Sequence, residues 1–142
     1  PQLAANVGLS YRSNNNIFLS ADFNYYNNMY LSMSPIYRTD AVITTGMTAE
    51  DIAHLRRQEK FDSAYTLNAS IGKNWYIHRQ YTLGFSLEVK NILNNQDIRT
   101  GGYEQTRLTK NTETTVTTYQ AFDSKYFYMF GTTYYLNLYF RF

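Results

Sequence analysis

Apolar and polar residues alternate along five separate segments of this 142-residue chain. Residues 126–142 show the pattern most clearly, with apolar or aromatic side chains at eight of nine even positions. The same alternation runs through residues 3–11, 17–30, 62–77 and 81–93. A period of two sends successive side chains to opposite faces of a β-strand. The sequence therefore predicts five strands, each with one apolar face and one polar face.

The predicted strands are long for a soluble protein. Strands in globular proteins usually contain about 5–6 residues, whereas residues 126–142 stay in phase from end to end. A tilted strand that crosses a bilayer needs about 9–11 residues. No apolar stretch approaches the roughly 20 residues of a membrane-spanning helix, so we expect strands to be the membrane elements.

Short and long connections alternate along the chain. Residues 12–16 and 78–80 are short turns, whereas residues 31–61 and 94–125 are long connections. Outer-membrane barrels have short periplasmic turns and long extracellular loops, and compact soluble domains rarely contain connections of that length. We therefore expect an all-β protein, an antiparallel up-and-down transmembrane β-barrel with two long extracellular loops. A soluble β-protein is the alternative that the alternation alone allows.

Aromatic residues make up 18% of the chain and gather near the ends of the predicted strands. Near the periplasmic ends we expect Tyr11, Phe18, Trp75, Tyr76, Tyr81, Phe140 and Phe142. Near the extracellular ends we expect Tyr25, Tyr26, Tyr30, Phe61, Tyr65, Tyr126 and Tyr128. Because aromatic rings with a polar edge favour the two membrane interfaces, this distribution predicts two aromatic girdles.

Five strands are too few to close a barrel, since the smallest single-chain examples have about eight. An open edge in lipid would leave backbone groups unpaired at several kcal/mol each. We therefore expect pairing with further strands, which precede the chain in a longer protein or come from other copies. The alternation of turns and loops predicts that Pro1 follows a cut in an extracellular loop and that Phe142 is the true periplasmic end.

Three segments resemble parts of TonB-dependent outer-membrane receptors. Residues 124–142 are similar to the last strand of that family, and residues 89–95, Val-Lys-Asn-Ile-Leu-Asn-Asn, look like an element of the penultimate strand. Residues 97–105, with Gly101-Gly102-Tyr103, resemble a loop of the SusC-like, carboxypeptidase-regulatory-like subgroup. The residues that look like the signal read by the barrel-assembly machinery are Leu136, Leu138, Phe140 and Phe142.

The resemblance implies that residues 1–142 are the C-terminal part of a receptor barrel domain, without its plug and earlier strands. It implies a location in the outer membrane of a Gram-negative bacterium and import of a bulky nutrient, a glycan or a peptide. The implied partners are outer-membrane lipid, the remaining strands and plug, the TonB system and a SusD-like surface lipoprotein. A non-transporting barrel used for adhesion or assembly, and an unplugged porin-like channel, are the alternatives.

The first long connection contains a predicted short helix over residues 46–60. Thr48 with Asp51 three residues later fits an N-terminal capping arrangement, and Arg56 and Arg57 suit the C-terminal end of the helix dipole. We interpret this helix either as a lid or docking surface for a lipoprotein, with Arg56 and Arg57 as contacts, or as a solvated loop helix without a partner.

The remaining candidate contacts are aromatic or charged. Tyr103 and Tyr119 belong to the second long connection, where their rings either stack on a sugar or peptide or pack within the loop. Residues 109–119 are Thr-rich and β-prone, so they extend the strands or stay mobile. The charged residues expected on the polar faces are Asp22, Glu88 and Lys90. These charges either contact substrate or plug, or simply line a hydrated wall.

Catalytic, metal and cofactor residues are not expected. The chain has no Cys, and its two histidines, His54 and His78, lie on opposite sides of the predicted membrane. No catalytic triad, phosphate loop or metal motif is visible, so we expect no enzymatic activity. A net charge of +2 is too small to indicate nucleic acid as a partner.

Overall fold

The computed structural model describes residues 1–39, 47–78, 80–110, 113 and 117–142, except for the side chains of Tyr37, Leu108, Lys110, Thr117, Thr118, Tyr119 and Ala121. The chain divides into two compact units, which we describe separately. The sheet unit consists of Pro1–Asn28, Asp62–Ile98 and Met129–Phe142. The hairpin unit consists of Met29–Phe61 and Arg99–Tyr128.

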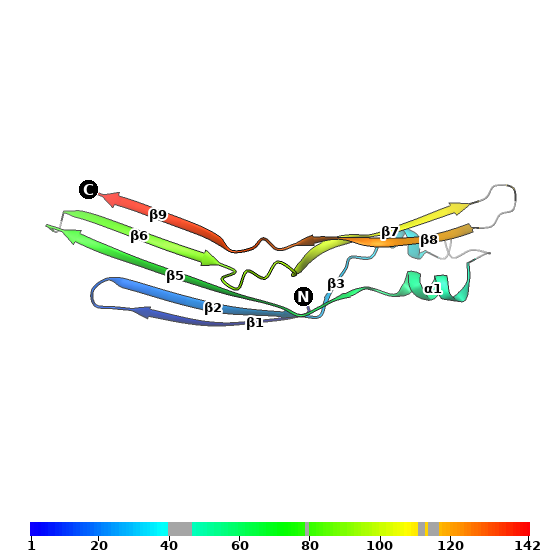
Figure 1. Cartoon of the computed structure of the whole chain (residues 1–142), viewed down its shortest axis with the longest axis horizontal. Coiled ribbons are helices and arrows are strands. Elements are labelled where there is room, and N and C mark those ends of the chain that lie inside the picture. Colours follow the sequence, from blue (N-terminus) through cyan, green and yellow to red (C-terminus); the bar gives the residue numbers. More distant parts are fainter. Residues whose placement is uncertain (40–46, 79, 111–112, 114–116) are drawn as a thin grey trace. The chain divides into compact units, whose positions relative to one another are not determined.

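The sheet unit is one antiparallel sheet with the strand order β1-β2-β5-β6-β9 (Figure 1). Within this sheet the strands therefore lie side by side in the order in which they occur along the chain. Its strands are β1 (Leu3–Arg12), β2 (Ile17–Asn27), β5 (Ala64–Ile77), β6 (Tyr81–Lys90) and β9 (Thr133–Arg141). The predicted all-β, antiparallel architecture is therefore confirmed. Alternation marked these segments correctly because the side chains of a strand alternate between its faces.

The register aligns the phases of all five strands. Leu9 lies opposite Ala21, which lies opposite Ala69, and Ala69 lies opposite Val89. One residue later, the hydroxyl side chains of Ser10, Ser20 and Ser70 pair in the same way, followed by Glu88. Since paired residues point to the same face, the sheet has one apolar face and one polar face.

Short turns join β1 to β2 and β5 to β6, as predicted. Ser13 N donates to Ile17 O at 2.8 Å and Asn16 has a left-handed φ of 57°. In the second turn Gln80 N donates to Ile77 O at 3.2 Å, after His78 with a φ of 50°. Asn tolerates this conformation because its short polar side chain bonds locally.

The prediction of one strand over residues 126–142 is wrong. The segment is divided between β8 (Thr117–Tyr128), which pairs with β7 (Arg99–Lys110), and β9, which pairs with β6. Hydrogen bonds from outside the strand hold the interruption: Met129 N donates to Ile98 O at 2.9 Å, and Thr132 N donates to the Asn94 side chain at 3.1 Å. The alternation continues through the break, so it could not reveal it.

Two other predicted strands end earlier than expected. Residues 17–30 divide at Asn28, and residues 81–93 end at Lys90, because Asn28 and Asn91 have left-handed φ values of 51°. A left-handed residue interrupts the extended backbone that a strand requires. The short strand β3 (Met29–Tyr30) then pairs with β4 (Lys60–Phe61) in the hairpin unit.

The hairpin unit contains the secondary structure of both long connections. The elements are β3, the 3₁₀ helix η1 (Pro35–Arg38), α1 (Ala49–Arg56), β4, β7 (Arg99–Lys110) and β8. The prediction of a loop over residues 97–105 is wrong for residues 99–105, which lie in β7 and pair with β8 across two register shifts. Gly102 has a φ of 154°, and a Cβ there would lie 2.0 Å from Lys125 O. Only glycine fits this irregular position, so Gly102 serves the irregular pairing of β7 with β8.

Helix α1 is shorter than the predicted residues 46–60, but its capping is confirmed. Asp51 N donates to Thr48 Oγ1 at 3.1 Å, and Thr48 N donates to Asp51 Oδ2 at 3.0 Å. The Thr48 hydroxyl also donates to Asp51 Oδ2 at 2.7 Å, and this bond, together with the bond from Thr48 N, stabilises the carboxylate and lowers the pKa of Asp51. Leu55 is the buried residue of this helix.

Candidate functional site

The apolar face of the sheet unit is exposed rather than packed into a core. Leu9 is 76% exposed, Leu138 is 69% exposed and Leu83 is 43% exposed. In the described part of the chain, the buried apolar residues of this unit are only Ala64 and Ile98. A soluble protein rarely exposes an apolar surface that spans several strands. Among the described residues, no helix is both long and apolar enough to cross a bilayer.

The four residues of the predicted assembly signal lie together along β9 and just after it. Leu136, Leu138 and Phe140 pair with Leu87, Phe85 and Leu83 on the apolar face. Their exposed fractions are 56–69%, and Phe142 is 94% exposed. β9 is an edge strand. The structure therefore gathers these side chains into one accessible apolar edge, and their recognition by an assembly machinery stays a prediction.

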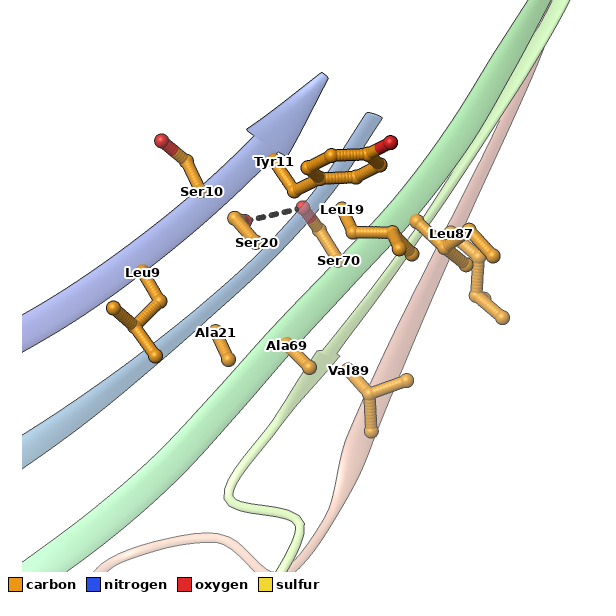
Figure 2. A pocket seen from close by; sticks show the side chains of 11 residues that line it. Leu9, Ser10, Tyr11, Leu19, Ser20, Ala21, Ala69, Ser70, Leu87 and Val89 are labelled. Carbon is orange, nitrogen blue, oxygen red and sulfur yellow. Dashed lines mark hydrogen bonds between the residues drawn. The ribbon is translucent and has the colours of Figure 1, made fainter. Parts of the chain in front are cut away.

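A shallow groove of about 410 Å³ crosses the apolar face. Ala21 and Ala69 form its floor because their side chains are the smallest in that row, and Leu9 and Val89 stand on either side of them (Figure 2). Figure 2 also shows that Ser20 and Ser70 share a hydrogen bond, at 2.7 Å, on the opposite face.

Aromatic rings gather at both ends of the sheet, although not in the full set predicted. At the short-turn end, the rings of Tyr81 and Phe140 are 5.8 Å apart and those of Trp75 and Phe85 are 5.9 Å apart. At the other end, Phe23 and Tyr65 are 6.2 Å apart. Phe18, Tyr26 and Tyr76 lie at strand ends as predicted but on the polar face. The remaining predicted rings belong to the hairpin unit and not to this sheet: Tyr30, Phe61, Tyr126 and Tyr128.

The polar face is a hydrogen-bonded network of amides, hydroxyls and one carboxylate. Asp22 accepts from the side chains of Asn24 at 3.2 Å and Asn68 at 2.7 Å. Asn24 in turn accepts from Asn6 at 2.8 Å and donates to Thr66 at 3.3 Å. These bonds connect three adjacent strands, so the polar side chains satisfy one another.

The three charged residues predicted on this face lie there. The Glu88 carboxylate and the Lys90 ammonium are 3.4 Å apart and well exposed, which makes their pairing weak. Two aromatic rings cover glycines on the same face: a Cβ on Gly72 would lie 2.0 Å from the Phe18 ring, and one on Gly84 would lie 2.3 Å from the Tyr139 ring. Tyr139 also donates its hydroxyl to Asn74 Oδ1.

Asn91 organises the end of β6 and is only 4% exposed. Its side-chain amide donates to Asn95 O and to Phe130 O, each at 3.0 Å, and its side-chain oxygen accepts from Asn95 N at 3.1 Å. Its backbone carbonyl accepts from the Thr132 hydroxyl at 2.8 Å. The Asn91 element therefore ties the end of β6 to the start of β9, which explains why an asparagine occupies this position.

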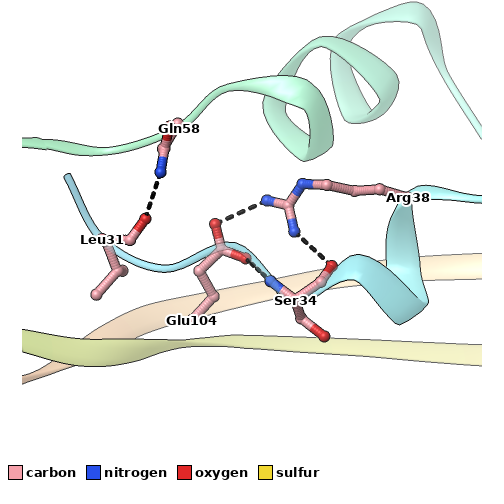
Figure 3. A network of polar contacts seen from close by, with 5 residues as sticks. All are labelled: Leu31, Ser34, Arg38, Gln58 and Glu104. Carbon is pink, nitrogen blue, oxygen red and sulfur yellow. Dashed lines mark hydrogen bonds and ion pairs between the residues drawn. The ribbon is translucent and has the colours of Figure 1, made fainter.

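The hairpin unit contains a polar cleft of about 540 Å³. On one side Arg38 and Glu104 form an ion pair at 2.7 Å, with each side chain 16% exposed. Glu104 also accepts from Ser34 N at 3.3 Å, while Arg38 donates to Ser34 O at 2.8 Å (Figure 3). These contacts fix η1 against β7 and leave the pair little freedom to engage a ligand.

A second cluster in this unit surrounds Glu59. Tyr126 donates its hydroxyl to Glu59 at 2.6 Å, and Arg99 lies 3.5 Å from the same carboxylate and 4.4 Å from the centre of the Tyr126 ring. The hydrogen bond to Glu59 raises the pKa of Tyr126, because ionisation would break it. The cluster joins β4, β7 and β8 and acts as packing.

The loop contacts predicted from the sequence do not form one site. Arg57 lines the cleft, whereas Arg56 is exposed at the end of α1 and does not line it. Tyr103 is 51% exposed, and its ring lies 6.3 Å from that of Phe127, away from the cleft. The Tyr119 side chain lies outside the described residues. Two pairs were not predicted from the sequence, Arg38 with Glu104 and Glu59 with Tyr126, because these partners are 66 and 67 residues apart.

Metal-binding clusters are absent from the described residues, in which no three His, Cys, Asp or Glu side chains lie close enough to hold an ion. His54 belongs to the hairpin unit and His78 to the sheet unit. Comparison of the chain with protein-family models, with curated proteins and with solved structures found no match. The two faces of the sheet are therefore the features from which a function must be argued.

Proposed function

We propose that this chain forms part of the wall of an outer-membrane β-barrel, and that the barrel is a TonB-dependent, SusC-like importer of a glycan or peptide. The observation that supports the wall most strongly is the common phase of five strands. It produces an exposed apolar face opposite a hydrogen-bonded polar face. Lipid on one side and a hydrated interior on the other satisfy both faces at once.

Closure of the barrel requires further strands. The edge strands β1 and β9 each have one strand neighbour in this sheet. In lipid, an unpaired strand edge costs several kcal/mol for each backbone group. The proposal therefore includes partner strands for both edges, either from the same protein or from other copies, and a location in the outer membrane of a Gram-negative bacterium.

The importer part of the proposal depends on resemblance in three segments: residues 89–95, residues 97–105 and the terminal strand. The hairpin unit is then an extracellular element, held by the Arg38–Glu104 pair and the Glu59 cluster. Such a folded element suits contact with a bulky nutrient or a SusD-like lipoprotein better than a mobile loop does, because less ordering entropy is lost on binding.

The test compares a strain that contains the gene with a strain from which it has been deleted. The protein is expected in the outer-membrane fraction, and the gene is expected to support uptake from a glycan or peptide pool. This uptake should disappear when TonB is removed or the proton-motive force is dissipated. Fractionation with soluble proteins would contradict the wall. Outer-membrane location with uptake independent of TonB would identify an open channel, and no uptake would favour an adhesive or assembly barrel.

A further inference from the structure

One charged side chain lies on the otherwise apolar face of the sheet. The register pairs Lys73 with Ile17 on one neighbouring strand and with Phe85 on the other, both members of the apolar face. The other charged strand residues described in this sheet lie on the polar face: Arg12, Asp22, Glu88, Lys90 and Arg141. Lys73 interrupts the alternation of β5 and was not among the residues predicted to have a function.

The position of Lys73 is specific in two ways. Its ammonium lies 5.2 Å from the centre of the Trp75 ring, a cation–π contact on the same face. Ile71, two residues earlier on the same face, lines the groove above Ala21 and Ala69. Because a strand rises about 3.4 Å per residue, Lys73 lies about 7 Å from Ile71 along β5, on the side of the groove that faces the short-turn end of the sheet.

We propose that the groove and Lys73 form a binding site for one anionic phospholipid. This inference rests on the proposed function, since it requires the apolar face to contact lipid. An acyl chain lies over Ala21 and Ala69, where the small side chains leave room for it. The phosphate group contacts the Lys73 ammonium, and Trp75 lies at the depth of the headgroup, which aromatic rings with a polar edge favour.

Charge complementarity decides between lipid classes. Within the described sheet, the acidic side chains nearest in register, Asp22 and Glu88, lie on the opposite face and are engaged with Asn68 and Lys90. The ammonium therefore has no carboxylate on its own face to neutralise it. A lipid with a net negative charge neutralises it in a medium of low dielectric constant, whereas a zwitterionic lipid supplies a phosphate together with its own cation.

Trp75 is the only tryptophan of the chain, so its fluorescence reports this site alone. The chain is reconstituted together with the strands that close the barrel, in which any tryptophan is replaced by phenylalanine. The phosphatidylcholine vesicles contain either brominated phosphatidylglycerol or brominated phosphatidylcholine, at low ionic strength to limit screening. Bromine quenches tryptophan on contact. We expect about a fivefold preference for the anionic lipid next to Trp75, which is the enrichment that one surface lysine produces.

Three variants identify the charge responsible. Lys73→Gln should abolish the preference and Lys73→Arg should retain it. Lys90→Gln, which removes a lysine from the polar face, should leave it unchanged. Equal quenching by both lipids, or a preference that survives Lys73→Gln, would overturn the site while leaving the barrel wall intact. No quenching by either lipid would mean that protein, such as a second copy, covers this face, and the proposed function would fail as well.

Discussion

Leu9→Arg is expected to destabilise the protein in a lipid bilayer by about 2–4 kcal/mol, the cost of a cation on the lipid face near the bilayer midplane. Leu9 lies opposite Ala21 in the central row of the apolar face and is 76% exposed in this chain. In water, a substitution at so exposed a site changes the free energy of unfolding by no more than about 0.5 kcal/mol. The measurement is guanidinium unfolding of the protein in phospholipid vesicles.

Ser10→Arg is the matched control for this prediction. Ser10 is the next residue of the same strand and pairs with Ser20 on the polar face. If that face lines a hydrated interior, the added cation remains in water and the free energy of unfolding should change by less than about 0.5 kcal/mol. Equal effects of the two substitutions would mean that the two faces of β1 meet the same environment, contrary to the proposal.

The second large effect is expected at Asn91. Asn91→Ala removes three side-chain hydrogen bonds, leaves the Phe130 carbonyl without its amide donor and keeps a φ of 51° that alanine disfavours. We expect a loss of about 3–4 kcal/mol in the free energy of unfolding, most of it from unpaired backbone groups. The same unfolding measurement in vesicles gives this value.

Two further substitutions separate the causes. Asn91→Gly tolerates the left-handed backbone, so it should recover about 1 kcal/mol of the loss while the hydrogen-bond cost remains. Asn95 contributes its main-chain N–H and carbonyl to the cluster, so Asn95→Ala should cost less than about 0.5 kcal/mol. A loss below about 1 kcal/mol for Asn91→Ala would show that this asparagine does not hold the end of β6.

Local periodicity predicted the strands well because the side chains of each strand alternate between an apolar face and a polar face. It also assigned Asp22, Glu88 and Lys90 to the polar face, where the register places them. Periodicity failed where the backbone changes partner without changing phase. Phe130 and Thr132 continue the alternation of residues 126–142, yet Phe130 O accepts from the Asn91 side chain and Thr132 N donates to the Asn94 side chain, so the strand is interrupted there.

The contacts of the hairpin unit could not be predicted from the sequence for a different reason. Arg38 and Glu104 are 66 residues apart, and neither belongs to a motif that would join them before the fold is known. Residues 97–105 resembled a loop that contains Gly101 and Gly102, whereas here Gly102 allows an irregular strand to approach β8 closely. Lys73 was not predicted because one polar residue in an alternating segment does not show which face it occupies. Its pairing with Ile17 and Phe85 places it on the apolar face.

The contact of one sheet face with lipid and of the other with water can be measured directly along β6. The chain contains no cysteine, so single cysteines introduced from Thr82 to Val89 place one nitroxide label at a time. In vesicles, labels at positions 83, 85, 87 and 89 should collide mainly with oxygen dissolved in lipid. Labels at positions 82, 86 and 88 should collide mainly with an aqueous nickel complex. If the labels at 83, 85, 87 and 89 were shielded from both reagents, a closed protein core would cover the apolar face and the barrel-wall account would be wrong.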